Sequence, residues 1–330
     1  MSVANELVVR DENERENDHG QRVSKIFHDA DFIVSSDYVK KSVKDQVNRF
    51  CELLFSSNSI SPSRMEYGMF AAKGAALRTL DLSRQVGAAV FNPTGEIIAM
   101  GSNEVPRAGG GTYWADQEPF DAREYVKGQD SNDIRKQEIL LEITQALGYS
   151  GPLDELLKLP AVKESQFMDA LEYGRIIHAE MSAISDAARL GLSLKESTLY
   201  CTTFPCHMCA KHIVAAGIEK VIFLEPYPKS LASDLHADSI QIEQEARGSF
   251  QDYSAVKFEH FFGVTPRRYR ELFEREKRKN GANFEPYIKS KKRPLIDYKY
   301  AFYKTLEQSV IEDGASALGR LMSVRASEHT

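Results

Sequence analysis

The chain has 330 residues, and 42 lysines and arginines against 48 aspartates and glutamates give it a net charge of −6. A protein that coats a polyanion is usually basic overall, so this balance argues against that class. The composition, 42% hydrophobic and 27% charged, is that of an ordinary soluble globular protein of about two domains. No apolar run approaches the roughly 18 residues of a membrane-spanning helix, so no membrane partner is expected.

Two further features predict a cytoplasmic protein. The N-terminus is acidic between residues 11 and 18 and lacks the basic stretch and apolar core of a signal peptide. The four cysteines are too few for a disulfide framework in a chain of this length, and they suit a reducing compartment where paired cysteines more often bind metal. They are Cys51, Cys201, Cys206 and Cys209.

The first 60 residues predict an N-terminal arm and a helical segment. Residues 1–20 are dense in charge and predict a solvated arm. Apolar residues at 23–27 have helical spacing, and 32–34 form a strand-like run. One amphipathic helix is predicted at 40–56. A second helix is predicted to begin after the start signal Ser61-Pro62-Ser63 and to run to Leu80.

From residue 85 the pattern alternates between strands and helices, with one interruption. Residues 86–91 and 95–100 predict a buried hairpin. Residues 103–177, with a glycine run, the single tryptophan and two predicted helices at 131–147 and 153–159, are interpreted as an insertion. The alternation after the insertion calls for parallel strands crossed by helices. Its elements are helix 179–190, strand 197–203, helix 206–216 and strand 219–224.

The C-terminal part is basic. A strand is predicted at 256–262 and a basic helix from Pro266 to about Lys279, and we assign 266–330 to a basic helical extension. Between 265 and 295 there are eleven lysines and arginines against four glutamates. The stretch 267–293 has three interpretations: a solvated helix face, a triphosphate-binding patch or an RNA-docking surface.

The residues most informative about function are His178-Ala179-Glu180 and Pro205-Cys206-His207-Met208-Cys209. One imidazole and two thiolates give a Zn²⁺ ion three protein ligands and leave its fourth tetrahedral position open, as in a catalytic site. Both motifs fall at predicted helix starts, where the helix dipole favours thiolate over thiol. We therefore predict one Zn²⁺ held by His178, Cys206 and Cys209.

Glu180 is predicted to be the catalytic proton shuttle. It lies two residues from His178, so its carboxylate can face the open position of the metal without being a ligand. A Cys-x-x-Cys pair alone also serves structural zinc, redox chemistry or core packing. A closed structural site would need a fourth ligand from His207, His212 or Cys201, and the positions of these residues favour packing or surface roles instead.

The H-x-E and P-C-x-x-C pattern is the signature of zinc-dependent nucleobase deaminases. Around it the chain resembles the deoxycytidylate deaminase branch of the cytidine deaminase superfamily, over roughly residues 80–226. That resemblance implies an α/β fold: a three-layer αβα sandwich with a mixed, largely parallel central sheet and helical additions. The matching segments are Ser83–Val90, Gly101–Asn103, His178–Met181, Thr198–Tyr200, Pro205–Lys211 and Ala216–Val221.

A narrower resemblance is to bacterial anti-phage deoxycytidine nucleotide deaminases, which lower dCTP or dCMP during infection. Residues 81–87, 103–106, 227–230 and 262–267 carry it. Those proteins usually have an N-terminal P-loop kinase-like domain; no G-x-x-x-x-G-K-[ST] motif occurs here, and residues 20–34 look like only the tail of such a domain.

The resemblance implies that residues 61–265 form a zinc-dependent deaminase domain with its insertion at about 103–177. Its reaction would convert dCMP or dCTP to the deoxyuridine nucleotide and ammonia, in a chain that forms a homo-oligomer. A regulatory RNA or protein partner is compatible with the sequence, but no residue demonstrates one.

Five residues are candidate substrate contacts by this resemblance. Asn103 would hydrogen-bond the sugar or its phosphate, unless it is only a turn residue. Arg84 would contact a phosphate, or serve as a solvated or structural charge. The loop of Trp114 would close on the base, or simply pack. Tyr227 and Lys229 would contact substrate or effector.

Two other functions stay open at this stage. A deaminase acting on cytosine or adenine within RNA or single-stranded DNA would need an electropositive channel, which the net charge disfavours and the basic stretch favours. A non-catalytic module that senses nucleotides would not need Glu180.

Overall fold

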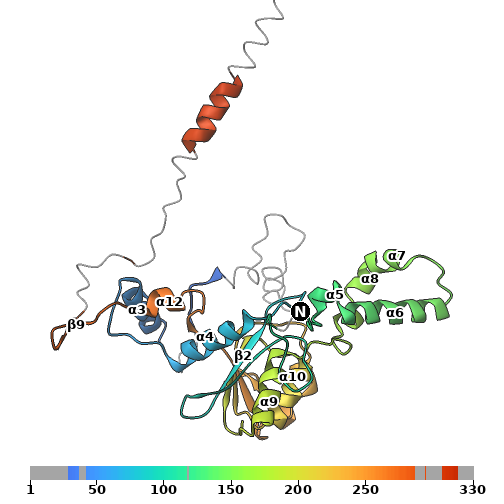
Figure 1. Ribbon diagram of the computed structural model, residues 1–330, viewed down its shortest axis with the longest axis horizontal. Coiled ribbons are helices and arrows are strands. Elements are labelled where there is room, and N and C mark those ends of the chain that lie inside the picture. Colours follow the sequence, from blue (N-terminus) through green and yellow to red (C-terminus); the bar gives the residue numbers. More distant parts are fainter. Residues whose placement is uncertain (1–28, 37–41, 117–118, 287–293, 295–306, 319–330) are drawn as a thin grey trace, which may run out of the picture.

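The computed structural model describes residues 29–36, 42–116, 119–286, 294 and 307–318 (Figure 1). A six-stranded sheet lies at its centre. From one edge to the other its strands are β3 (Ile97–Ser102), β2 (Gly87–Phe91), β4 (Thr198–Thr203), β5 (Lys220–Glu225), β7 (Val256–His260) and β6 (Ile240–Ile242). β2 is antiparallel to both of its neighbours, and the last four strands are parallel. The predicted mixed, largely parallel sheet is confirmed.

Helices cover both faces of the sheet. On one face α4 (Arg64–Ala76) packs on alternate residues such as Ala89 and Tyr200. On the other face, α9 (Ala179–Leu190) and α10 (His207–Ala215) pack on the strand residues that alternate with those under α4. Because successive strand residues point to opposite faces, a strand apolar throughout is buried between two helical layers. The αβα sandwich is therefore confirmed.

Two glycines set how closely the helices approach the sheet. A Cβ at Gly87 would lie 2.0 Å from the carbonyl oxygen of Ala72 in α4, and a Cβ at Gly101 would lie 2.1 Å from the carbonyl oxygen of Ala179 in α9. Real side chains cannot approach backbone this closely. Gly101 thus allows the first residue of α9 to lie directly against β3.

The insertion contains the predicted helices and adds a wall beside the sheet. Figure 1 shows α6, α7 and α8 projecting away from the sheet on one side of the molecule. The insertion's helices are α5 (Glu124–Lys127), α6 (Ser131–Ala146), α7 (Leu153–Lys158), α8 (Pro160–Lys163) and the 3₁₀ helix η2 (Gln166–Asp169).

The segments before and after the sheet pack against each other. β1 (Phe32–Ile33) pairs antiparallel with β8 (Gly263–Val264). α3 (Val43–Leu54), predicted at 40–56, shares an apolar cluster with α12 (Tyr269–Phe273). Other elements outside this pairing are α11 (Ala232–Leu235), the 3₁₀ helix η3 (Gly248–Phe250), and a longer helix at 307–318.

Two predicted elements differ from the structure. The helix expected to reach Leu80 ends at Ala76, and residues 77–82 form a loop that brings Asp81 to the cavity described below. The basic helix expected over 266–279 is wrong: α12 ends at Phe273, and β9 (Lys279–Asn280) pairs with β10 (Asn283–Phe284). Arg275 donates to the carbonyl of Glu274 at 2.8 Å, which satisfies an acceptor at the helix end.

Some predicted features lie outside the described residues. These are the charged arm at 1–20, the helical spacing at 23–27, and the lysines and arginine at 289–293. Within the described residues, no helix is long and apolar enough to cross a membrane.

Glu66 joins three parts of the fold through one buried carboxylate. It accepts hydrogen bonds from both terminal nitrogens of Arg49 in α3, at 2.7 and 2.8 Å. It also accepts from the backbone nitrogens of Ser63, at 2.7 Å, and Val264, at 2.8 Å. The side chain is 1% exposed, so these four donors replace water around the charge.

We predict that Glu66→Gln lowers the free energy of unfolding by about 3–5 kcal/mol, because it removes one partner of a buried ion pair. Chemical denaturation measures the change. Glu138→Gln breaks the exposed pair with Arg135 and serves as the control, with a change below about 1 kcal/mol. Equal effects of the two substitutions would contradict the role given to Glu66.

Candidate metal centre and active-site cavity

The two sequence motifs meet where α9 and α10 begin. His178 is the N-cap residue of α9, and Cys206 is the N-cap residue of α10. Cys209 lies one turn into α10 and is fully buried. Both helices pack on the same face of the sheet, so their N-terminal ends place these side chains together.

The three candidate ligands form a compact donor set. The Nδ1 atom of His178 is 3.3 Å from the Sγ atoms of both Cys206 and Cys209. A tetrahedral zinc with ordinary Zn–N and Zn–S bonds would separate such atoms by about 3.6 Å. One nitrogen and two sulfurs at this spacing therefore fit a single zinc ion. Among the described residues, these three are the histidine, cysteine and acidic side chains grouped closely enough to hold a metal.

The three alternatives for a fourth ligand lie outside the donor group, although the Cys201 side chain hydrogen-bonds the Glu180 carboxyl beside it. The Nδ1 atom of His212 is 2.7 Å from the carbonyl of Met208. His207 points its Nε2 atom to within 4.0 Å of the carboxylate of Glu172. Cys201 is buried on β4. A donor set of three leaves a zinc ion with an open position, which favours the catalytic interpretation.

Glu180 lies beside this donor set without belonging to it. Its Oε2 atom is 3.5 Å from the Sγ atom of Cys209, and the residue is buried. Burial, together with the negative charge of Cys206, raises the pKa of the Glu180 carboxyl. The hydrogen bond with Cys209, and then the one with His178, lowers the pKa of the Cys206 thiol to about 4. A thiolate is thus ready for metal, and the carboxyl is ready to exchange a proton.

A cavity of about 440 Å³ opens onto these residues. One side is formed by the sheet and helix ends, including His178, Glu180 and Cys206. The opposite wall comes from the insertion, through α5, α6 and the segment around η2. The volume suits a small molecule of nucleotide size.

Asn103 lines the cavity, but its amide is occupied by the protein. Its Oδ1 atom accepts from the backbone nitrogen of Val86 at 2.8 Å. Its Nδ2 atom donates to the carboxylate of Asp81 at 2.6 Å and to the carbonyl of Arg84 at 2.8 Å. Both amide hydrogens are used, so in this arrangement Asn103 positions the loop that carries Asp81 and Arg84.

Three other predicted contacts lie at the cavity, and one does not. Arg84, Tyr227 and Lys229 line it, and the guanidinium carbon of Arg84 is 5.1 Å from the ring centre of Tyr227. Trp114 is not among the lining residues; it is 52% exposed and stacks on Arg78 at 3.6 Å. In this arrangement the Trp114 side chain packs on Arg78, and its closing on a base stays a prediction.

Sequence reasoning missed the residues that the insertion adds to the cavity. They carry no recognisable motif, because they come from a largely polar helix and its flanks. Their one sequence signal is a run of polar residues at the start of the predicted helix at 131. They are Glu124, Asp130, Ser131, Asn132, Asp133, Lys136, Asp169 and Arg175.

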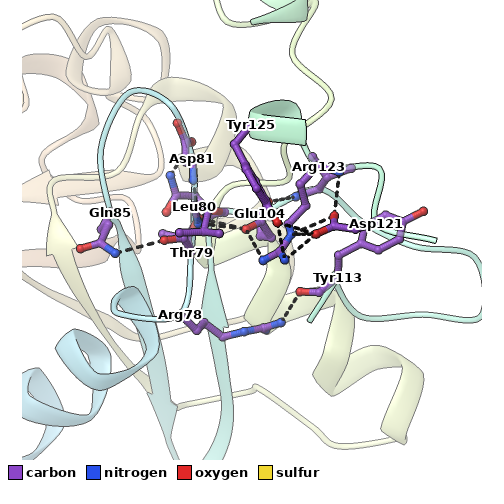
Figure 2. Close-up of polar contacts among 12 residues, drawn as sticks. Arg78, Thr79, Leu80, Asp81, Gln85, Glu104, Tyr113, Asp121, Arg123 and Tyr125 are labelled. Atoms are coloured by element: carbon purple, nitrogen blue, oxygen red, sulfur yellow. Dashed lines mark hydrogen bonds and ion pairs between the residues drawn. The ribbon is translucent and has the colours of Figure 1, made fainter. Parts of the chain in front are cut away.

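A buried polar network ties the insertion to the sheet (Figure 2). Arg123 is 2% exposed. Its Nη2 atom donates to the carboxylate of Asp121 at 2.6 Å. Its Nη1 atom is 3.8 Å from the carboxylate of Glu104. Glu104 follows β3 and accepts from the backbone nitrogen of Leu80 at 3.0 Å. The network links the insertion to the loop that carries Asp81.

Several arginines in the described part of the basic stretch have partners within the protein, whereas Lys277, Arg278 and Lys279 are exposed. Arg268 pairs with Asp31 and Glu271, and Arg270 pairs with Glu274. Arg275 donates to backbone carbonyls. Arg268 and Arg275 thus join the C-terminal segment to the N-terminal one, a role that none of the three sequence interpretations included.

Comparison with known proteins gives a consistent set of relatives. A family model for the cytidine and deoxycytidylate deaminase zinc-binding region matches residues 62–225. The deoxycytidylate deaminase of Enterobacteria phage T2 is 48% identical over 54 residues, 16% of this chain and 29% of that enzyme. The mouse deoxycytidylate deaminase is 28% identical over 159 residues, 48% of this chain and 63% of that enzyme. The chain thus spans less than two thirds of these two relatives.

A tRNA-specific adenosine deaminase of Bacillus subtilis is also similar. It is 36% identical over 113 residues, which is 33% of this chain and 70% of that enzyme. Among solved structures, a dCMP deaminase from cyanophage S-TIM5 is 19% identical and covers 61% of this chain and 100% of its own, with a TM-score of 0.33. A superposition at that level carries no argument about the present chain.

We predict that Asp121 stabilises the fold in a pH-dependent way. The hydrogen bonds from Arg123 lower the pKa of the Asp121 carboxyl from 3.8 to about 2. A depressed folded-state pKa contributes stability that is present above the unfolded-state pKa and is lost as the pH falls through the folded-state pKa. The stability difference between the parent chain and Asp121→Asn should therefore be constant at neutral pH and shrink between about pH 4 and pH 2.

Urea denaturation at a series of pH values measures this difference. Asp154→Asn, on the exposed surface of α7, is the control and should change stability little at any pH. A difference for Asp121→Asn that stays constant down to pH 2 would show that its carboxylate is not held by Arg123.

Proposed function

This chain belongs to the cytidine and deoxycytidylate deaminase zinc-binding family, and we propose that it is a zinc-dependent hydrolytic deaminase of a deoxycytidine nucleotide, dCMP or dCTP. One observation carries the proposal. The His178, Cys206 and Cys209 donor set lies beside the buried Glu180 carboxyl, and His178, Cys206 and Glu180 line a nucleotide-sized cavity.

In this proposal His178, Cys206 and Cys209 hold the zinc ion. Zinc with three protein ligands supplies Lewis acidity, which activates water for attack on the amine-bearing ring carbon. The burial that surrounds the site excludes bulk water and strengthens the interactions of charged groups within it.

Glu180 moves the protons of the reaction. Its Oε2 atom takes one proton from the attacking water and delivers it to the ring nitrogen. The same carboxylate then takes the remaining hydroxyl proton as the new C=O bond forms and gives it to the departing amine as the C–N bond breaks. One water is consumed, and the products are the deoxyuridine nucleotide and ammonia. The raised pKa of Glu180 suits a group that must both accept and release a proton near neutral pH.

The choice of substrate rests on two supports. The phage T2 and mouse relatives are deoxycytidylate deaminases. Arg268, Arg270 and Arg275 of the basic stretch are engaged with carboxylates and carbonyls, which weakens the case for a polynucleotide channel. The similarity to a tRNA-specific adenosine deaminase makes that channel the alternative to test.

The proposal extends to the setting of the enzyme. We infer a cytoplasmic homo-oligomer, because the nucleotide pool is cytoplasmic, zinc-binding thiols need a reducing compartment, and the resemblance is to enzymes that are commonly oligomers. Depletion of deoxycytidine nucleotides would make the chain an anti-phage defence enzyme.

We predict that Glu180→Ala lowers deamination by about 10²–10⁴-fold, the usual contribution of a general acid–base group, and keeps zinc. Ammonia release and product mass measure turnover of dCMP, dCTP, CMP, cytidine and a cytosine-containing single-stranded oligonucleotide. Zinc content and thermal unfolding show that site and fold survive. Glu172→Gln, which lies near the site but does not line the cavity, is the matched control and should retain activity.

Three outcomes would contradict the proposal. Full activity of Glu180→Ala would show that Glu180 is not the proton shuttle. Turnover of the oligonucleotide alone would favour the polynucleotide deaminase. Binding of nucleotide without turnover, in zinc-loaded parent protein, would favour a non-catalytic sensor.

A further inference from the structure

An ion pair crosses one side of the cavity. The Nζ atom of Lys229, which follows β5, is 2.5 Å from the Oδ1 atom of Asp169, the last residue of η2 in the insertion. Both residues line the cavity. The side chains are 54% and 32% exposed, so the pair lies where the cavity meets solvent. It is a contact between the two walls of the cavity, made by residues 60 positions apart in the sequence.

The other cations that line the cavity are held more firmly or lie beside this pair. Lys136 is 4% exposed and binds the carbonyl of Met168 and the carboxylate of Asp133. Arg175 pairs with the buried carboxylate of Glu124 at 3.3 Å. Arg84 lies over the ring of Tyr227, two residues before Lys229. Among the lining cations that pair with a carboxylate, Lys229 is thus the most exposed, at 54% against 32% for Arg175 and 5% for Lys136.

The backbone around Asp169 is fixed by buried side chains of α6. Lys136 donates to the carbonyl of Met168 at 2.7 Å, and Asn132 donates to the carbonyl of Ala170 at 2.8 Å. Lys136 and Asn132 are both more than nine-tenths buried. Hydrogen bonds therefore fix the backbone on both sides of Asp169. The Asp169 side chain is held in a position from which it contacts Lys229.

We propose that Asp169 occupies the position on Lys229 that the 5′-phosphate of the substrate takes, so that the pair makes the cavity selective for nucleotides over nucleosides. The inference rests on the proposed function. A phosphate carries more charge and more acceptor oxygens than a carboxylate, and it forms stronger charge-assisted hydrogen bonds with an ammonium group. A nucleotide can therefore exchange with Asp169. A nucleoside gains nothing on Lys229 in return for opening the pair.

The position of the pair fits this exchange. Arg84 adds a second cation near Tyr227, on the same side as Lys229. The carboxylate of Asp169, released from Lys229, can rotate into water because it is partly exposed already. Glu180, His178 and Cys206 line the same cavity, so one molecule can present its base to them and its phosphate to Lys229.

The test compares binding of dUMP and deoxyuridine, the unreactive products with and without phosphate, to the zinc-loaded full chain by calorimetry. Lys229→Ala should weaken dUMP binding by about 10–100-fold, the loss of one charge-assisted contact, and shift the dUMP-to-deoxyuridine affinity ratio by the same factor. Asp169→Asn keeps the shape of the side chain and removes the competing charge, so it should strengthen dUMP binding several-fold. That gain should shrink when Lys229→Ala is also present.

Lys220→Ala is the matched control, because Lys220 pairs with Glu259 at 3.2 Å and does not line the cavity. It should leave both affinities unchanged. The proposal is overturned if Lys229→Ala leaves the affinity ratio unchanged, or if Asp169→Asn weakens dUMP binding, which would make Asp169 a direct contact to the ligand. If the parent chain binds neither ligand and deaminates neither dCMP nor dCTP, the proposed function itself fails. If it binds dUMP or deaminates dCMP and the variants still leave the ratio unchanged, only the exchange at Lys229 fails.

Discussion

The arrangement of the site depends on how closely α9 lies against β3. The absent side chain of Gly101 leaves room for the carbonyl of Ala179, the residue between His178 and Glu180. This contact fixes the height of the N-terminal end of α9 above the sheet. Cys206 and Cys209 come from a separate helix on the same face, so the spacing of sulfur and nitrogen follows from the packing of two helices on one sheet. A rigid layer, and not a loop, holds the metal donors.

Buried carboxylates perform a similar task farther from the site, where the sheet must be joined to added segments. Glu66 attaches α3 and β8 to α4, and Glu104 attaches the insertion to the loop after α4 through Arg123. Each is almost fully buried and surrounded by donors. An apolar contact tolerates sliding, whereas a carboxylate with three or four fixed donors does not. Such anchors let the insertion form a cavity wall although α6, α7 and α8 project away from the sheet.

The parts of the structure that the sequence predicted are those governed by local periodicity and by motif spacing. Helix 179–190 and the strands around the zinc motif have clear apolar patterns and glycine end signals, and the structure reproduces them within a residue or two. The basic helix failed for a tertiary reason. Arg268 and Arg275 find partners in segments more than 200 residues away, and no local pattern reveals such pairs. The cavity wall from α6 was missed for the same reason, since Asn132 and Lys136 act on the backbone of η2.

The charge of the chain, considered residue by residue, bears on what the cavity can admit. Counting lysines and arginines between 265 and 295 suggests an attractive surface for a polyanion, yet a cation already neutralised by a neighbouring carboxylate contributes little to the field at a distance. The same reasoning applies inside the cavity, where Lys136, Arg175 and Lys229 each have a carboxylate partner. Arg84, which also lines the cavity, lies over the ring of Tyr227 instead. In our proposal a ligand is recognised mainly by exchange at short range and not by long-range attraction. Exchange favours a compact anion that reaches the cavity with its charge concentrated at one end. A mononucleotide has that form. A long polyanion would instead need many unpaired cations in a row.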